Sequence, residues 1–260
     1  MKTTLILALT LTAGSAFAQQ PAAPATKAPT AQVDARFAAW LGCWRLDDDL
    51  AGTGARMCIT PDKGGVRLQT VVGTQRGIDE LVIPDGVARP ISDSECTGTE
   101  RAEWSKDGAR IFRNTDVTCG KEAPRKVESV AFMATGPAWI NVQHVSGKLS
   151  NESVNVQRYR RAFNQQLADG TLAPQADAQL AARTTPEVTT WGVDDVIEGS
   201  SKVPVAVMQA ALSEAHHPFD LNKKTLISLA ENGVDSDVID LMVALTYPCL
   251  LYTSPSPRDS

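Results

Sequence analysis

Between Phe37 and Arg161, short runs rich in Val, Ile and Thr alternate apolar and polar positions. Gly, Pro, Asp and Asn separate these runs, as is typical of strands joined by turns. A period of two residues indicates β-strands with one buried face. The regular spacing, without a helix-length interruption, favours an antiparallel up-and-down meander. The expected strands are 43–46, 56–60, 66–73, 78–83, 96–105, 109–118, 126–134, 139–146 and 153–160.

After residue 190 the apolar period changes to about 3.6 residues, which indicates short amphipathic helices that need a shared core. Asn222 and Asp235 suit helix N-caps, and Gly233 suits a helix C-cap. The apolar stripes lie within 203–211, 226–230 and 238–245. The chain therefore predicts an α+β protein, with an antiparallel up-and-down β-barrel of about 8–10 strands followed by a small α-helical domain.

The first residues have the three-part pattern of a secretory signal peptide. Lys2 precedes an apolar run from Leu5 to Thr12, and Ala16-Phe17-Ala18 forms a small-residue cleavage site. The run is too short for a transmembrane anchor, which needs about 20 apolar residues. We expect a signal peptide at 1–18, a disordered leader at 19–35, the barrel at 36–161, a linker at 162–189 and a helical domain at 190–248.

The last residues form a separate case. The run CLLYTSPSPRD, from Cys249 to Asp259, resembles the translation of a sequencing adaptor. We interpret residues 249–260 as an artefactual tail and the helical domain as truncated near Pro248. A natural Ser/Pro-rich tail is the alternative interpretation.

The composition excludes one class of partner. The formal net charge is −5 and the basic residues are scattered rather than clustered. Because phosphate contacts dominate nucleic-acid affinity, we expect no nucleic-acid binding.

Four cysteines precede the tail: Cys43, Cys58, Cys96 and Cys119. An even number in an exported chain favours disulfides in an oxidising compartment, here the periplasm or the exterior. Zinc is the alternative, but no Cys-x-x-Cys or Cys/His spacing supports it. A count around the turn from Asp49 to Gly54 brings Cys43 near Cys58.

The second cysteine pair follows from one hairpin. Asp107-Gly108 is a strong signal for a two-residue type I′ turn, and that turn places Cys96 opposite Cys119. In the strict register this pair falls at a hydrogen-bonded site, where the Cα atoms lie farther apart. A bulge near Gly98 would relieve the mismatch.

The run from Phe37 to Trp44, FAAWLGCW, resembles the opening of lipocalin-like, calycin-type barrels, in which a short helical turn leads into Gly-x-Trp. The resemblance covers residues 36–161 and implies that Gly42 and Trp44 are structural residues that help to close the barrel. It also implies that an arginine from the last strand, Arg158 or Arg160, packs over Trp44. The order of barrel and helices is also similar to that of other exported bacterial proteins, which implies no activity.

Three cationic side chains are candidate ligand-binding residues. Strand alternation places Arg113, His144 and Arg158 on faces that also carry apolar residues. If those faces point inward, the cations would hold an acidic head group while apolar neighbours hold a tail. In the alternative interpretation these residues lie near the rim or pair with Glu100, since charged residues are rarely buried unpaired.

Enzymatic signatures are missing from the sequence. It has no Gly-x-Ser-x-Gly elbow, phosphate-binding Gly-rich loop or His-Glu-x-x-His, and it implies no cofactor. The pair His216-His217 lacks metal-ligand spacing, and we interpret it as a helix end. We therefore expect a non-enzymatic exported protein that binds a small hydrophobic or amphipathic ligand. The alternative is a structural or protein-interaction module of the cell envelope, with a partner docked on the helical domain.

Overall fold

The computed structural model describes residues 34–49, 54–92, 95–134, 138–147, 150–174, 190–215 and 217–249. The predicted signal peptide, nearly all of the leader, much of the linker and the tail after Cys249 lie outside the described residues.

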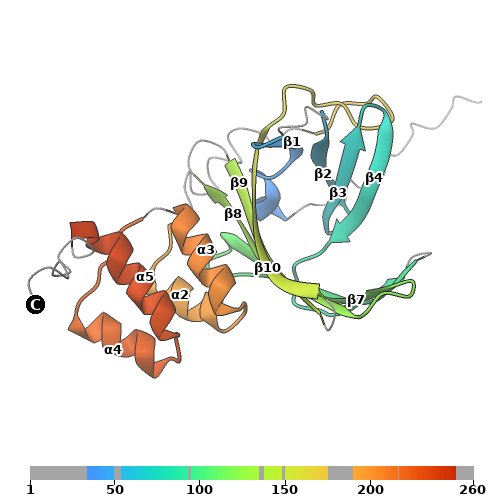
Figure 1. Ribbon diagram of the computed structural model, residues 1–260. Helices are drawn as coiled ribbons and strands as arrows, with labels where there is room; N and C mark the ends of the chain where they lie inside the picture. The colour runs from blue at the N-terminus through green and yellow to red at the C-terminus, as the bar shows by residue number, and fades with distance from the viewer. Residues whose placement is uncertain are drawn as a thin grey trace, which may run out of the picture. The chain divides into compact units, whose positions relative to one another are not determined.

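The predicted α+β fold class is confirmed. Ten antiparallel strands form one curled sheet, a half-barrel, with the order β4-β3-β2-β1-β10-β9-β8-β7-β6-β5 (Figure 1). A short 3-10 turn, η1 (Ala35–Phe37), precedes the strands β1 (Gly42–Leu46), β2 (Arg56–Asp62), β3 (Gly65–Val72), β4 (Gln75–Val82), β5 (Arg89–Ser92), β6 (Cys96–Trp104), β7 (Arg110–Cys119), β8 (Arg125–Ala134), β9 (Ala138–Gly147) and β10 (Ser150–Arg161).

Closure of the barrel differs from the prediction. The first and last strands do meet, since β1 pairs with β10, but among the described residues β4 and β5 form no ladder with each other. After β4 the chain turns at Pro84, and Asp85 bridges to Glu103 at the end of β6. The chain after β4 thus joins the end of β6 and does not turn back along β4, so the sheet opens between two strands that are consecutive in the chain.

Strand β5 was not among the expected strands. It is only four residues long and contains Pro90, which argues against a central strand. Its position resolves the conflict, because β5 is an edge strand that pairs only with β6.

The register of the β6–β7 hairpin is as predicted, with Cys96 opposite Cys119. The turn type is not, because a type I′ turn requires a positive φ at Asp107, and only Gly108 has one (72°). Asp107 instead accepts a hydrogen bond from the backbone N–H of Ala109 at 3.0 Å. The predicted bulge near Gly98 is absent, since the pairing runs without a shift along both strands.

The altered turn leaves the opposing residue pairs unchanged. It exchanges which of these pairs are hydrogen-bonded and which are not. The Ser105 N–H donates to the Arg110 carbonyl at 2.9 Å, and the Gly120 N–H donates to the Glu95 carbonyl at 2.7 Å. Hydrogen-bonded pairs alternate with non-hydrogen-bonded ones, so Cys96 and Cys119 form a non-hydrogen-bonded pair. Their Cα atoms are 4.0 Å apart and the disulfide forms there.

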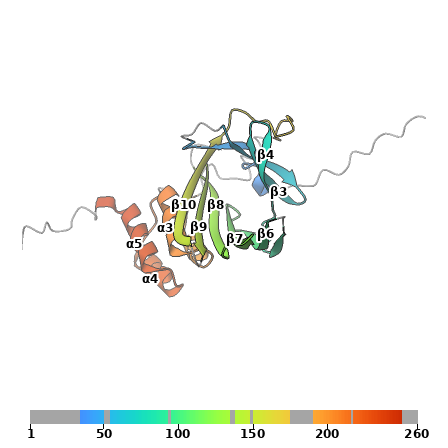
Figure 2. The same cartoon turned by 45° about the vertical axis from the view of Figure 1, so that its right-hand side comes forward.

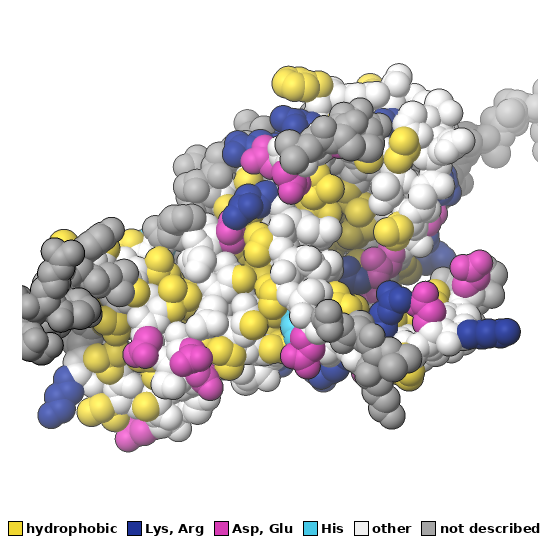
Figure 3. Space-filling model, in the orientation of Figure 1, with side chains coloured by type: hydrophobic (Ala, Val, Ile, Leu, Met, Phe, Trp, Pro, Cys, Tyr) yellow, Lys and Arg dark blue, Asp and Glu magenta, His cyan; other side chains and the backbone are white. Residues whose placement is uncertain are grey.

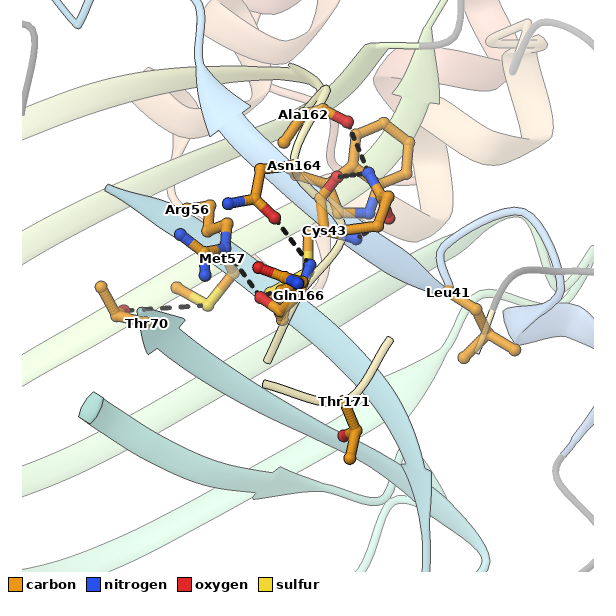
Figure 4. The surroundings of a disulfide bond; sticks show 12 residues. Leu41, Cys43, Arg56, Met57, Thr70, Ala162, Asn164, Gln166 and Thr171 are labelled. Atoms are coloured by element: carbon orange, nitrogen blue, oxygen red, sulfur yellow. Dashed lines mark hydrogen bonds between the residues drawn. A yellow bond between two sulfur atoms is a disulfide. The ribbon is translucent and has the colours of Figure 1, made fainter. Parts of the chain in front are cut away.

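The second disulfide, Cys43–Cys58, joins β1 to β2 and is fully buried. The segment after β10 covers it. The side chain of Gln165 accepts from the Cys43 N–H at 2.8 Å and donates to the Cys43 carbonyl at 3.0 Å. Arg56 donates to the Gln166 carbonyl at 2.9 Å, and Figure 4 shows these residues side by side.

The junction of β1 and β10 corrects one residue assignment. The guanidinium that packs over Trp44 belongs to Arg161, at 4.1 Å from the ring centroid, and not to Arg158 or Arg160. Alternate residues of a strand point to opposite faces, and Arg161 shares the inner face with Tyr159. Gly42 has a φ of 110°, and a Cβ there would lie 2.5 Å from the Arg161 guanidinium, so glycine is required.

Four helices follow the sheet, and the predicted caps are confirmed. Asn222 and Asp235 accept backbone N–H groups at the starts of α4 and α5, and Gly233 has a positive φ after α4. The helices are α2 (Val193–Ser200), α3 (Val205–Ala215), α4 (Lys223–Glu231) and α5 (Ser236–Thr246). None of these described helices has the length and apolar character needed to cross a bilayer.

The helices share a core with the outer face of the sheet. Helix α3 packs against β8, β9 and β10 (Figure 2), where Phe132 meets Trp191 edge-on at 5.7 Å between ring centroids. Arg110, fully buried, stacks on Trp191 and forms ion pairs with Asp107 at 2.8 Å and Asp195 at 3.2 Å. The outer face of β7–β10 therefore contributes to a second apolar core, which it shares with the helices.

We expect Arg161→Lys to lower the free energy of unfolding by about 1–3 kcal/mol, because lysine cannot both stack on Trp44 and donate in a fork to the Ala39 and Leu41 carbonyls. Arg160→Lys is the matched control: its half-exposed side chain pairs with Asp47, and the change should cost less than about 0.5 kcal/mol. Urea unfolding of both variants measures the difference, and equal losses would contradict the assignment.

The two disulfides should differ in their rate of reduction. Access controls thiol–disulfide exchange, and the Cys96–Cys119 pair is partly exposed whereas Cys43 and Cys58 are fully buried. We expect a limiting dose of dithiothreitol, followed by alkylation and mass spectrometry, to label Cys96 and Cys119 first. Cys249, a free and exposed cysteine, reports full labelling without reductant. Earlier labelling of the β1–β2 pair would refute the expectation.

Candidate functional site

The inner face of the half-barrel encloses a cavity of about 390 Å³. Figure 3 shows apolar side chains gathered in the recess between the strands. The walls come from η1 and from strands on both sides of the β1–β10 junction. Apolar lining residues include Phe37, Trp40, Leu46, Met57, Ile59, Val66, Leu68, Ile78, Val82, Ile111, Ala131, Trp139 and Tyr159.

Aromatic rings form one end of the cavity. Trp139 stacks on Tyr159 at 4.3 Å between ring centroids, and Trp40 meets Trp139 edge-on at 6.0 Å. Burial raises the pKa of Tyr159 to about 12, so its phenol stays protonated at neutral pH. The indole Nε1–H of Trp139 is buried and has no acceptor among the described residues. A ligand oxygen could accept that hydrogen bond.

Amide side chains form a polar strip on the same wall. Asn141 and Gln143 come from β9, and Gln157 comes from β10. The amide of Asn141 donates to Gln157 Oε1 at 3.0 Å. These groups both donate and accept, so they can bind a polar ligand group of either kind.

A three-residue ion cluster spans the open seam of the sheet. Arg113 on β7 forms an ion pair with Glu100 on β6 at 3.0 Å and another with Glu80 on β4 through the same Nη2. Glu80 and Arg113 both line the cavity. The cluster therefore connects edge strand β4 to the β6–β7 hairpin, where backbone pairing is absent among the described residues.

The two carboxyl groups titrate differently. Burial raises the pKa of Glu100 to about 7, and the nearby Glu80 carboxylate adds to the rise, although Arg113 opposes it. Burial also raises the pKa of Glu80, but the charge of Arg113 and hydrogen bonds from the cluster outweigh it, so the net pKa lies below the usual value. Near neutral pH, one carboxyl is ionised and the other is close to half protonated.

The structure does not bring the three candidate ligand-binding residues together. Only Arg113 lines the cavity; His144 and Arg158 lie on the outer face of β9 and β10. The Arg158 guanidinium binds Glu214 of α3, with Nε 2.6 Å from Oε2. His144 Nδ1 lies 3.9 Å from Glu128.

The assignment of faces failed because the more apolar face of β9 is the outer one, whereas its inner face carries Asn141 and Gln143. Ile140 and Val142, which share a face with His144, pack against the helices, whereas Trp139 on the other face points into the cavity wall. Arg113 does pair with Glu100, as the alternative interpretation predicted.

The sequence contained one signal for the residue that was missed. Glu80 lies between Ile78 and Val82 on the inner face of β4, a charge within an otherwise apolar alternation. A charge in that position needs a partner, and Arg113 occupies the same type of position on β7. Among the described residues, no group of three or more His, Cys, Asp or Glu is arranged to hold a metal ion, and His216 lies outside them.

We expect Glu100→Gln to remove a pH dependence of stability. The pKa of Glu100 is about 7 in the folded chain and 4.5 ordinarily. Between these pH values the folded chain binds more protons than the unfolded chain. The free energy of unfolding therefore falls as pH rises through that window. Glutamine mimics the protonated form. The variant should match the parent near pH 5 and exceed its free energy of unfolding near pH 8 by on the order of 1–3 kcal/mol.

Urea unfolding across this pH range provides the measurement. The pKa of Glu80 is lowered from its ordinary value of 4.5, so its titration affects stability only at pH values below this window. Glu231→Gln, exposed on α4, serves as the control. A parallel loss of stability with pH in parent and Glu100→Gln would contradict the titration of Glu100.

Comparison of the chain with protein-family models and with curated protein sequences finds no match. The resemblance of Gly42-Cys43-Trp44 to the first strand of lipocalin-like barrels therefore has one structural support: the curled antiparallel half-barrel followed by helices is compatible with such a barrel.

Proposed function

We propose that the half-barrel binds a small amphipathic molecule in its interior. The observation that carries this proposal is the cavity of about 390 Å³, which lies within the usual size range of small-molecule sites. Its walls are mainly apolar and aromatic, with a few polar groups at defined positions. That combination provides hydrophobic affinity for a chain or ring and hydrogen bonds for one polar group.

The polar groups limit the orientation of the molecule. The amide strip and the Trp139 indole lie on β9 and β10, whereas the ion cluster lies across the seam on β4, β6 and β7. An apolar body between them would contact Ile59, Leu68 and Ile111, which come from β2, β3 and β7.

We also propose that the protein works in the periplasm or outside the cell. Two disulfides indicate an oxidising compartment. The signal-peptide pattern of residues 1–18 supports export as the way to reach it.

A cavity-filling variant tests the ligand proposal. We expect Thr70→Phe, on the inner face of β3, to weaken binding of the apolar dye N-phenyl-1-naphthylamine at least about tenfold, because the added ring occupies the site. Thr99→Phe, an exposed position on β6 outside the cavity, should bind the dye like the parent. Dye fluorescence gives both affinities, and circular dichroism confirms folding.

The outcomes separate the two interpretations of the fold. Absence of dye binding by the parent would refute the cavity as the site and would favour the structural or protein-interaction module. Equal binding by both variants would also refute the cavity as the site.

A further inference from the structure

The charge of the ion cluster differs from that of a site for an acidic head group. Two carboxylates, from Glu80 and Glu100, share one guanidinium nitrogen of Arg113. The side chains of these three residues are 32%, 13% and 22% exposed, so solvent screens them only in part. With both carboxylates ionised, the cluster carries one excess negative charge. Glu80 and Arg113 line the cavity, and Glu100 lies behind them against Arg113.

Two neighbouring cations do not alter this balance. Arg56 on β2 borders the cavity, but it shares a strand face with Cys58, and its guanidinium donates to the carbonyls of Gln166 and Gly73. Arg89 on β5 lies opposite Glu100 in the ladder, but its guanidinium binds Asp85 at 2.6 Å. On the inner face of β8, the residue opposite Arg113 is the uncharged Ser129. An incoming carboxylate would therefore meet a cation that two glutamates already bind, and an incoming cation would meet the excess carboxylate.

A second observation points to a ligand in the same cavity. Trp139 is 5% exposed and lines the cavity, and its indole N–H has no partner among the described residues. A buried donor without an acceptor costs free energy, which an oxygen atom of a bound molecule would restore.

We infer that the cavity selects apolar amines over fatty acids, with Glu80 as the binding residue for the ammonium group and Glu100 as the second carboxylate of its cluster. This inference rests on the proposed function and specifies its ligand class. It replaces the expectation that cationic side chains bind an acidic head group, because His144 and Arg158 lie outside the cavity.

The selectivity should depend on pH in a defined direction. The raised pKa of Glu100, about 7, means that the cluster passes from balanced to negative as pH rises from about 6 to about 8. Affinity for an amine, which stays protonated throughout this range, should rise over it. Affinity for a neutral alcohol of the same chain length should stay constant.

The test compares decylamine, decanol and decanoate, each displacing N-phenyl-1-naphthylamine from the full chain. Near pH 8 we expect decylamine to bind about tenfold tighter than decanol, the factor of one added charge-assisted contact, and decanoate to bind weakest. Glu80→Gln and Glu100→Gln should each reduce the preference for the amine and leave the affinity for decanol within about twofold. Glu128→Gln, on the outer face of β8, is the matched control.

The outcomes test the proposed function and the ligand class separately. If none of the three compounds and no dye binds, the proposed function fails. If all bind with equal affinity, if decanoate binds best, or if Glu80→Gln and Glu100→Gln leave the amine preference unchanged, the inference fails while the cavity remains a binding site. Circular dichroism and urea unfolding of each variant show whether a lost preference reflects lost structure.

Discussion

The short ladder between β1 and β10 is the contact on which the rest of the fold depends. Only three residue pairs form it, Trp44–Arg161, Arg45–Arg160 and Leu46–Tyr159. Side chains compensate for its length: Arg161 covers Trp44 and also donates to the turn before β1. Tyr159 stacks on Trp139, which extends the contact to β9. Without this junction, β1–β4 and β5–β10 would be two separate sheets joined by one connection, and neither would enclose a cavity.

The opposite side of the sheet is held in a different way. Where backbone pairing stops between β4 and β5, an ion cluster of Glu80, Arg113 and Glu100 takes its place. Partly buried ion pairs contribute little net stability, because desolvation offsets much of their attraction. Their value here lies in position, because the side chains that connect the two edges also form the polar end of the cavity. The seam and the proposed binding site are thus one feature, so changes to one affect the other.

Much of the fold followed from local patterns, and the site did not. Two-residue alternation predicted every strand except β5. This edge strand is short and contains Pro90, which argues against a strand. Turn counting predicted both disulfides, although Asp107 adopts a different turn from the expected one. The choice of inner and outer faces failed at His144 and Arg158, because the apolar face of β9 and β10 packs against the helices. Their inner face carries the amides of Asn141, Gln143 and Gln157, so the more apolar side of these strands is not the side that faces the cavity. Only the partner elements decide which side does, and these are distant in the sequence.

Both disulfides join cysteines that are consecutive along the chain, with separations of 15 and 23 residues. A chain that emerges N-terminus first therefore offers Cys43 its correct partner before Cys96 has appeared. Oxidation in order of emergence produces the native pairs, so incorrect pairs that an isomerase would have to rearrange arise only when oxidation lags behind emergence. Correct cross-linking therefore depends on whether each pair is oxidised before the next cysteine emerges. It does not depend on whether the distant strands β1 and β10 have already paired.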